Sequence, residues 1–215
     1  PLTLAESLAT LQPEDVISSC LSFASISTIQ AARNMLDTLT FTDYGNVVMF
    51  SDYASLLWNS PKLVRGFSEN VEELKHLVSK ERPQGQANFQ AAFEMAFHLL
   101  SDGCSGKAAC FNCQKIIFFL TDGRDSSGWN GESIRPTRMA RIIDDLQNNL
   151  EQQTGKRASI FMYSMSRNAD DAIPRQIACS NDGAWSFIGP NTKTFDALSS
   201  YYLYAAAHKR MDSPV

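Results

Sequence analysis

Three short, uninterrupted apolar runs constrain the fold of this chain more than any other feature. They occupy residues 47–50, 116–120 and 160–163. A strand with consecutive apolar residues must be buried on both faces of its sheet. This is typical of parallel strands, whereas antiparallel strands often have one face exposed to solvent. The sequence therefore predicts a sheet that helices cover on both sides.

Amphipathic segments separate these runs. Their apolar residues recur with the 3.6-residue period of a helix, so each segment offers one apolar stripe to the sheet. The predicted helices lie in residues 28–39, 71–78, 89–100, 139–150, 173–179 and 195–207, with a last short strand in residues 185–188. With right-handed crossovers, this alternation predicts an α/β fold: a mostly parallel, doubly wound, Rossmann-like sheet with helices on both faces.

The length and the charge of the chain limit the functions that it can have. A chain of 215 residues with 44% hydrophobic content can bury the core of one sizeable domain. The formal net charge is −4 and no basic stripe is available to bind phosphates, so we expect no nucleic-acid partner. No apolar run approaches the roughly 20 residues that a membrane-spanning helix needs. We expect a soluble part of a longer protein.

Cysteines crowd into the segment SDGCSGKAACFNCQK. Cys110 and Cys113 have the spacing of half a zinc site, but no second CxxC or histidine pair follows at ligand spacing. A disulfide within or from this loop is favoured, and the odd count leaves one thiol free or paired outside the segment. The five cysteines are Cys20, Cys104, Cys110, Cys113 and Cys179.

The apolar run at residues 116–120 ends abruptly on Thr121, Asp122 and Gly123. In an open parallel sheet, ligands bind at the carboxyl ends of the strands, and Asp122 follows such an end. The same Asp-Gly pair is also a common turn, chosen for its backbone conformation. Both interpretations of Asp122, as a ligand and as a turn residue, stay open at this point.

Several motifs occur together in one order. FFLTDG, NFQAAFEMAFHLL and IQAARNMLDTLTFTDYGNVVMFSD resemble the von Willebrand factor A domain. With IACSNDGAWSFI and CQKIIFFLTDG, the chain resembles more narrowly the version in alpha-2-delta calcium-channel subunits and VWA-and-Cache proteins. The resemblance implies an N-terminal extension with a degenerate first strand and loop in residues 1–28, a VWA-like domain in residues 29–208, and a tail in residues 209–215 that leads to a Cache-like segment.

The resemblance also implies a metal-ion-dependent adhesion site at the top of the sheet. In the family, a DxSxS loop after the first strand, a threonine in the second loop and an aspartate in the third hold a divalent cation through oxygen ligands. Asp122 matches the third-loop aspartate. Ala87 stands where the family has its threonine, with Asn88 beside it, so a hydroxyl ligand is missing.

The first loop can be aligned in two registers. DVISS in residues 15–19 keeps the aspartate but replaces the middle serine by Ile17, whereas FASIS in residues 23–27 keeps Ser25 and Ser27 but replaces the aspartate by Phe23. Either residues 16–23 form a weak central strand, or the chain has residues that this sequence lacks. With Asp122, Ser25 and Ser27 as the remaining candidate ligands, we expect Mg²⁺ or Ca²⁺ to bind weakly or not at all.

No catalytic constellation is present. The three histidines belong to no paired-ligand motif, and no GxSxG, Walker or GxGxxG motif occurs, so we expect no enzyme. The resemblance implies a protein-interaction module at the cell surface or outside the cell, whose partner is a channel or another membrane complex. The predicted partner-binding face consists of Asn88, Asp122, Arg124, Asp125 and Trp129.

Two other functions stay open. The module is an architectural part of a larger extracellular or ciliary assembly without a ligand, or it is an intact metal-dependent adhesion domain whose first loop is missing from this sequence. Trp129 lies in the insertion SSGWNGESIRPTR, which is long enough to overhang the predicted face. It is either an exposed interface anchor or a ring folded back onto the domain.

Overall fold

A computed structural model describes residues 16–22, 26–58, 62–82, 85–102, 113–121, 124–166, 171–189 and 201. Within these residues, seven strands form one sheet in the order β3-β2-β1-β5-β6-β7, with β4 paired to β2. The parallel strands are β1 (Val16–Ser22), β2 (Tyr44–Phe50), β5 (Lys115–Thr121), β6 (Ala158–Ser164) and β7 (Trp185–Phe187). The predicted α/β sheet is confirmed.

The first strand lies in the middle of the sheet, although its sequence is only patchily apolar. Ser19 of β1 pairs with Val47 of β2 on one side and with Phe118 of β5 on the other. Two complete ladders of backbone hydrogen bonds therefore hold a strand whose side chains give a weak signal. Of the two explanations that the sequence left open, the structure supports a weak central strand.

Two short antiparallel strands at the β2 edge were missed by the sequence analysis. β3 (Ala54–Leu56) pairs with the carboxyl half of β2, and β4 (Val64–Arg65) pairs with its first residues. Strands of three and two residues are too short to show an alternating pattern. They end the sheet with short edges, which limits pairing to other chains.

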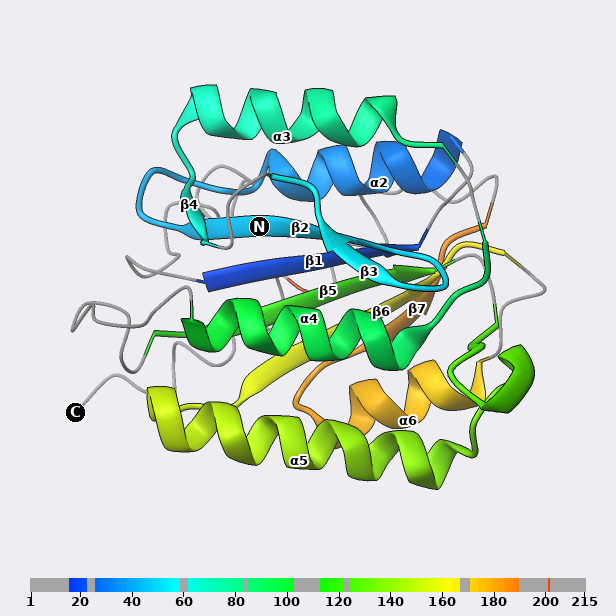
Figure 1. Ribbon diagram of the computed structural model, residues 1–215. Helices are drawn as coiled ribbons and strands as arrows, with labels where there is room; N and C mark the ends of the chain where they lie inside the picture. The colour runs from blue at the N-terminus through cyan, green and yellow to red at the C-terminus, as the bar shows by residue number, and fades with distance from the viewer. Residues whose placement is uncertain are drawn as a thin grey trace, which may run out of the picture.

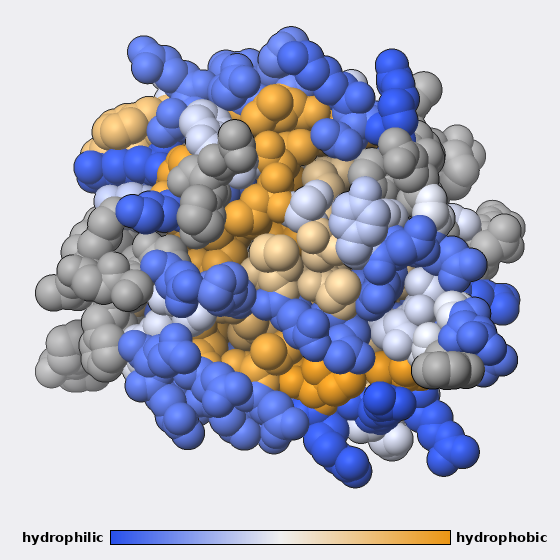
Figure 2. Space-filling model, viewed as in Figure 1, coloured by the Kyte–Doolittle hydropathy of each residue, from blue (hydrophilic) through white to orange (hydrophobic). Residues whose placement is uncertain are grey.

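Helices cover both faces of the sheet, as predicted (Figure 1). α2 (Ile26–Leu36) and α3 (Ser68–Lys80) lie on one face, and α4 (Phe89–Asp102), α5 (Pro136–Thr154) and α6 (Ala172–Ser180) lie on the other. Hydrophilic side chains cover the outward faces of α3 and α5, with apolar residues between the helices (Figure 2).

Of the predicted terminal helix, only Tyr201 is described; it is helical and buried. Among the described helices, none is long and apolar enough to span a bilayer.

β5 shows why a continuous apolar run was needed. Its side chains alternate between the two faces, so Phe118 belongs to the core on the α2 and α3 face, while Phe119 belongs to the core on the α4 face. The Phe119 ring is 4.6 Å from the Phe93 ring and 4.9 Å from the Phe89 ring, centroid to centroid. On the other face, the Tyr201 ring lies 4.8 Å from that of Phe118. Both faces of the strand are therefore core.

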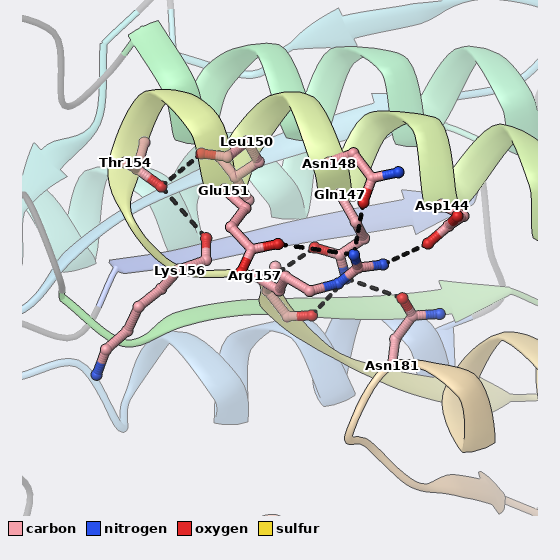
Figure 3. A network of polar contacts seen from close by, with 10 residues as sticks. Asp144, Gln147, Asn148, Leu150, Glu151, Thr154, Lys156, Arg157 and Asn181 are labelled. Carbon is pink, nitrogen blue, oxygen red and sulfur yellow. Dashed lines mark hydrogen bonds and ion pairs between the residues drawn. The ribbon is translucent and has the colours of Figure 1, made fainter.

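A buried polar network joins α5 to β6 and α6 (Figure 3). The Gln147 side chain is fully buried; its amide nitrogen donates to the Ala158 carbonyl at 2.7 Å and its oxygen accepts from the Ala158 N–H at 2.8 Å. The same nitrogen also donates to Asn181 Oδ1 at 2.9 Å. Nearby, Arg157 donates to Asp144 and Asn148 at the surface. The network lies at the amino end of β6, away from the predicted ligand edge.

Candidate functional site

The carboxyl ends of β1, β2, β5 and β6 meet the first turn of α4 at one end of the molecule, on the right in Figure 1. Two described loops shape this edge. The second loop, residues 85–88, precedes α4, and the third loop, residues 124–135, follows β5 and contains the short 3-10 helix η2 (Trp129–Gly131). Ala87 and Asp125 form an isolated parallel bridge between the two loops.

The bounds of β1 and α2 show which of the two registers places the first loop after the first strand. Ser18 and Ser19 lie inside β1, so the register at residues 15–19 cannot form a loop beyond the strand. The register at residues 23–27 follows the end of β1, and Ser27 falls in the first turn of α2. Asp122 and Ser25 lie outside the described residues, as does the side chain of Ser27. Their roles as metal ligands stay predictions.

Asn88 caps α4 and ties it to β2. Its side-chain oxygen accepts from the Ala91 N–H at 3.0 Å, which is the bond expected of an N-cap residue. Its backbone N–H donates to the Ser51 carbonyl at 2.9 Å and its Nδ2 donates to the Asp52 carbonyl at 3.2 Å. Asn88 is therefore half-buried, and much of its hydrogen-bonding capacity is used within the chain.

Asp125 lies beneath the edge and not on it, which corrects its assignment to the partner-binding face. Its side chain is 2% exposed. Oδ1 accepts from the N–H groups of Phe89 at 3.3 Å and Ser127 at 3.1 Å, and Oδ2 accepts from the Ile134 N–H at 3.0 Å. The carboxylate thus joins the third loop to the start of α4, and it is too deeply buried to touch a partner.

Polar side chains occupy the positive end of the α4 dipole. The N–H groups of Phe89, Gln90 and Ala91 donate in turn to the side chains of Asp125, Ser127 and Asn88. The Ser127 hydroxyl also donates to Asp125. A helix N-terminus attracts anions because its first N–H groups have no partner within the helix. Here the protein's own carboxylate and side-chain oxygens fill that position.

The described residues of the second and third loops supply few side-chain oxygens that the protein does not already use. Ala87, 9% exposed, brings no oxygen from its side chain, and its backbone carbonyl accepts from the Ser126 N–H at 2.9 Å. The Asp125 carboxylate is shared among several donors. In the part of the chain that the structure describes, no three His, Cys, Asp or Glu side chains are grouped as metal ligands. Hard cations need several converging oxygens.

The remaining predicted face residues are placed in part. Arg124 is exposed at the start of the third loop, next to Asp125. The backbone of Trp129 is described as part of η2, whereas its side chain lies outside the described atoms, so neither interpretation of that ring is tested. Gly131, with a φ of 78°, packs against the Gln86 side chain. The insertion therefore contacts the second loop.

The β2–β3 turn also belongs to this edge, and the sequence analysis missed it. Tyr53 is 70% exposed there, next to the exposed Asp52. The Asp52 side chain accepts from the Gln86 N–H at 3.1 Å, which joins the turn to the second loop. Neither residue was predicted as a site residue, because the turn follows β2 and is brought to α4 only by the fold.

Cysteine and histidine positions give no catalytic arrangement among the described residues. Cys179 is exposed with a free thiol. His76 and His98 are both exposed, and His98 lies 3.3 Å from Asp102 on the same helix. Cys104 and Cys110 lie outside the described residues, so the disulfide prediction for that loop is untested.

Sequence comparison finds similar proteins, although no protein-family model matches the chain. Over 152 residues, or 69% of the chain, it is 30% identical to human voltage-dependent calcium channel subunit alpha-2/delta-2. Over 190 residues, or 87%, it is 25% identical to human inter-alpha-trypsin inhibitor heavy chain H6. The chain spans 11% and 14% of the lengths of these relatives.

Solved structures share the fold at lower identity. A von Willebrand factor type A protein from Catenulispora acidiphila matches with a TM-score of 0.65 and 18% identity, over 91% of this chain and 42% of that one. Proximal thread matrix protein 1 from the mussel byssus, with a zinc-occupied MIDAS motif, matches with a TM-score of 0.56 and 14% identity, over 90% of this chain and 45% of that one.

Proposed function

For a chain that has the von Willebrand factor A fold and resembles the alpha-2/delta calcium-channel subunits in sequence, we propose a role as a non-enzymatic protein-interaction module. The module belongs to an extracellular or cell-surface protein, and its metal-ion-dependent adhesion site is degenerate. Its partner is a voltage-dependent calcium channel or another membrane complex, a class suggested by the name of the similar subunit alpha-2/delta-2.

One observation supports the proposal that the metal site is degenerate: the protein's own side chains already bind the N–H groups at the start of α4. In place of a second-loop hydroxyl, Ala87 offers a methyl group, and the buried Asp125 carboxylate accepts from the Phe89 N–H that opens α4. The two loops are thus held together by hydrogen bonds that need no cation. The edge is preorganised for protein contact without metal.

The first experiment is a calorimetric titration of the chain with Mg²⁺, Ca²⁺ and Mn²⁺. Binding weaker than about 1 mM is expected, because few oxygen ligands remain. Micromolar affinity that disappears in Asp122→Ala would show instead that the site is intact. That result would favour a metal-dependent adhesion domain.

The second experiment measures binding to the pore-forming subunit of a voltage-dependent calcium channel, in EDTA and in Mg²⁺. We expect equal binding in both, and a loss in Arg124→Ala, because Arg124 is an exposed charge at the edge. Lys62→Ala is the matched control, since Lys62 is exposed beside β4 near the opposite end of β2. Circular dichroism checks the fold of each variant. No binding by the wild-type chain would favour the architectural role.

A further inference from the structure

The turn between β2 and β3 is held rigidly at the ligand edge. The Ser51 N–H donates to the Tyr53 carbonyl at 2.9 Å within the turn. Asn88 and Gln86 donate to the Ser51 carbonyl, the Asp52 carbonyl and the Asp52 side chain. Gly85, with a φ of 64°, packs directly against Asp52, so a side chain there would collide with it. The turn and the second loop form one unit.

This unit exposes an aromatic ring without a partner. In the described part of the chain, the exposed large hydrophobic residues are Phe41, Tyr53 and Phe67. The Arg65 guanidinium covers Phe67 at 5.2 Å from the ring centroid, and Arg65 also donates to the Phe41 carbonyl. Among the residues that the structure describes, the Tyr53 side chain has no hydrogen bond, ring contact or cation contact. An exposed tyrosine on a hydrogen-bonded turn is a typical anchor of a protein interface.

A carboxylate without a counter-ion stands next to this ring. The Asp52 side chain accepts from the Gln86 N–H through Oδ1, and it forms no ion pair with any described residue. Asp52 is exposed, so its charge is available to a partner. The turn therefore carries a negative charge and an aromatic ring on neighbouring residues, and the second loop holds the turn backbone and the Asp52 side chain by hydrogen bonds.

The molecule uses the same pair of groups elsewhere to hold an arginine. The Arg175 guanidinium lies 3.9 Å from the centroid of the Trp185 ring and 3.7 Å from the Asp171 carboxylate. An aromatic face attracts a cation through its quadrupole, and a carboxylate attracts it by charge. The β2–β3 turn carries the same two kinds of group, and no described arginine or lysine side chain contacts them.

We propose that the β2–β3 turn receives an arginine or lysine side chain of the partner protein, with its cation over the Tyr53 ring and paired with the Asp52 carboxylate. This rests on the proposed function, for which it supplies the recognition residue. The formal net charge of −4 also favours approach of a basic protein surface. The partner residue would thus bring its own positive charge to an edge where a divalent cation fits poorly.

The test is an NMR titration of the isotope-labelled protein with capped Gly-Arg-Gly and Gly-Lys-Gly at constant ionic strength. Saturable shifts of the Tyr53 ring and of the amides of residues 52–54 are expected, with a dissociation constant on the order of tens of millimolar for a single side chain. Gly-Gln-Gly and Gly-Glu-Gly are the controls. No localised shift with the arginine peptide, or an equal shift with the glutamate peptide, would overturn the proposal.

Variants separate the two contributions. Asp52→Asn keeps the oxygen that accepts from Gln86 but removes the charge, and Tyr53→Leu keeps an apolar side chain but removes the ring; each is expected to weaken peptide binding about two- to five-fold. Tyr53→Phe is expected to bind normally, and Phe41→Leu serves as the matched aromatic control. Unchanged binding in both Asp52→Asn and Tyr53→Leu contradicts the assignment. Because these peptides report on the turn alone, the result is independent of whether a calcium channel binds.

Discussion

Replacement of Asp125 by alanine tests whether this buried carboxylate, and not a metal ion, holds the ligand edge together. The substitution removes the acceptor of the Phe89, Ser127 and Ile134 N–H groups, at 3.3, 3.1 and 3.0 Å. A buried donor left without a partner costs about 1–3 kcal/mol, and entry of water into the loop relieves part of this. We expect Asp125→Ala to lower the free energy of unfolding by about 3–6 kcal/mol.

Thermal and urea unfolding measure this loss, and amide hydrogen exchange locates it. For a chain of this size, the melting temperature should fall by roughly 6–24 °C, and exchange should accelerate at Phe89 and Ile134. Asp145→Ala is the matched control, because Asp145 is exposed on α5 and is expected to change stability by less than about 0.5 kcal/mol. A loss below about 1 kcal/mol in Asp125→Ala, with unchanged exchange at both amides, would refute the reasoning.

Three further changes test the core and the metal site. Gln147→Leu should cost about 3–5 kcal/mol by urea unfolding, because the buried Ala158 backbone groups lose both of their bonds to the side chain. Burial lowers the pKa of Lys115, so Lys115→Met should stabilise the protein by about 1 kcal/mol near neutral pH, with a gain that shrinks as the pH rises through this lowered pKa. The double change Phe23→Asp with Ala87→Thr should create Mg²⁺ binding measurable by calorimetry, because it completes the family's ligand pattern.

Each of these changes has its own control. Gln152→Leu is the same substitution at an exposed position of α5 and should be close to neutral. Below its lowered pKa, the wild-type lysine is charged in both the folded and the unfolded state, and burial of that charge destabilises the folded protein. A stability gain in Lys115→Met that grows toward alkaline pH would therefore contradict a lowered pKa of Lys115. Ile17→Ser with Ala87→Thr completes the other register and should bind no Mg²⁺; binding there and not in the first pair would reverse the choice of register.

Local patterns in the sequence predicted the layered architecture well. The run at residues 116–120 became the two-faced β5, and the stripe at residues 89–100 became α4. Such patterns are readable because periodicity depends on neighbouring residues. β1 was harder to predict, since its backbone ladders stabilise it more than its side-chain pattern suggests, and β3 and β4 were too short to be seen.

The candidate site was predicted only in part. The resemblance located the second loop through Ala87 and Asn88, and the structure confirms that Asn88 lies at the start of α4. It assigned Asp125 to the surface, whereas Asp125 is buried under the third loop. Tyr53 had no local signal, because an aromatic residue just after a buried strand such as β2 is equally compatible with the core.

The sequence by itself determined the order of the helices and of the apolar strands, the two-sided burial of the sheet and the loss of a hydroxyl at Ala87, because each is a property of one residue or of close neighbours. Only the tertiary structure decided which register follows β1 and which groups meet at its edge. Asp125 reaches the Phe89 N–H across 36 positions of the chain, and Asp52 reaches Gln86 across 34. Contacts at that separation depend on how helices and loops pack against the sheet, and no local pattern encodes them.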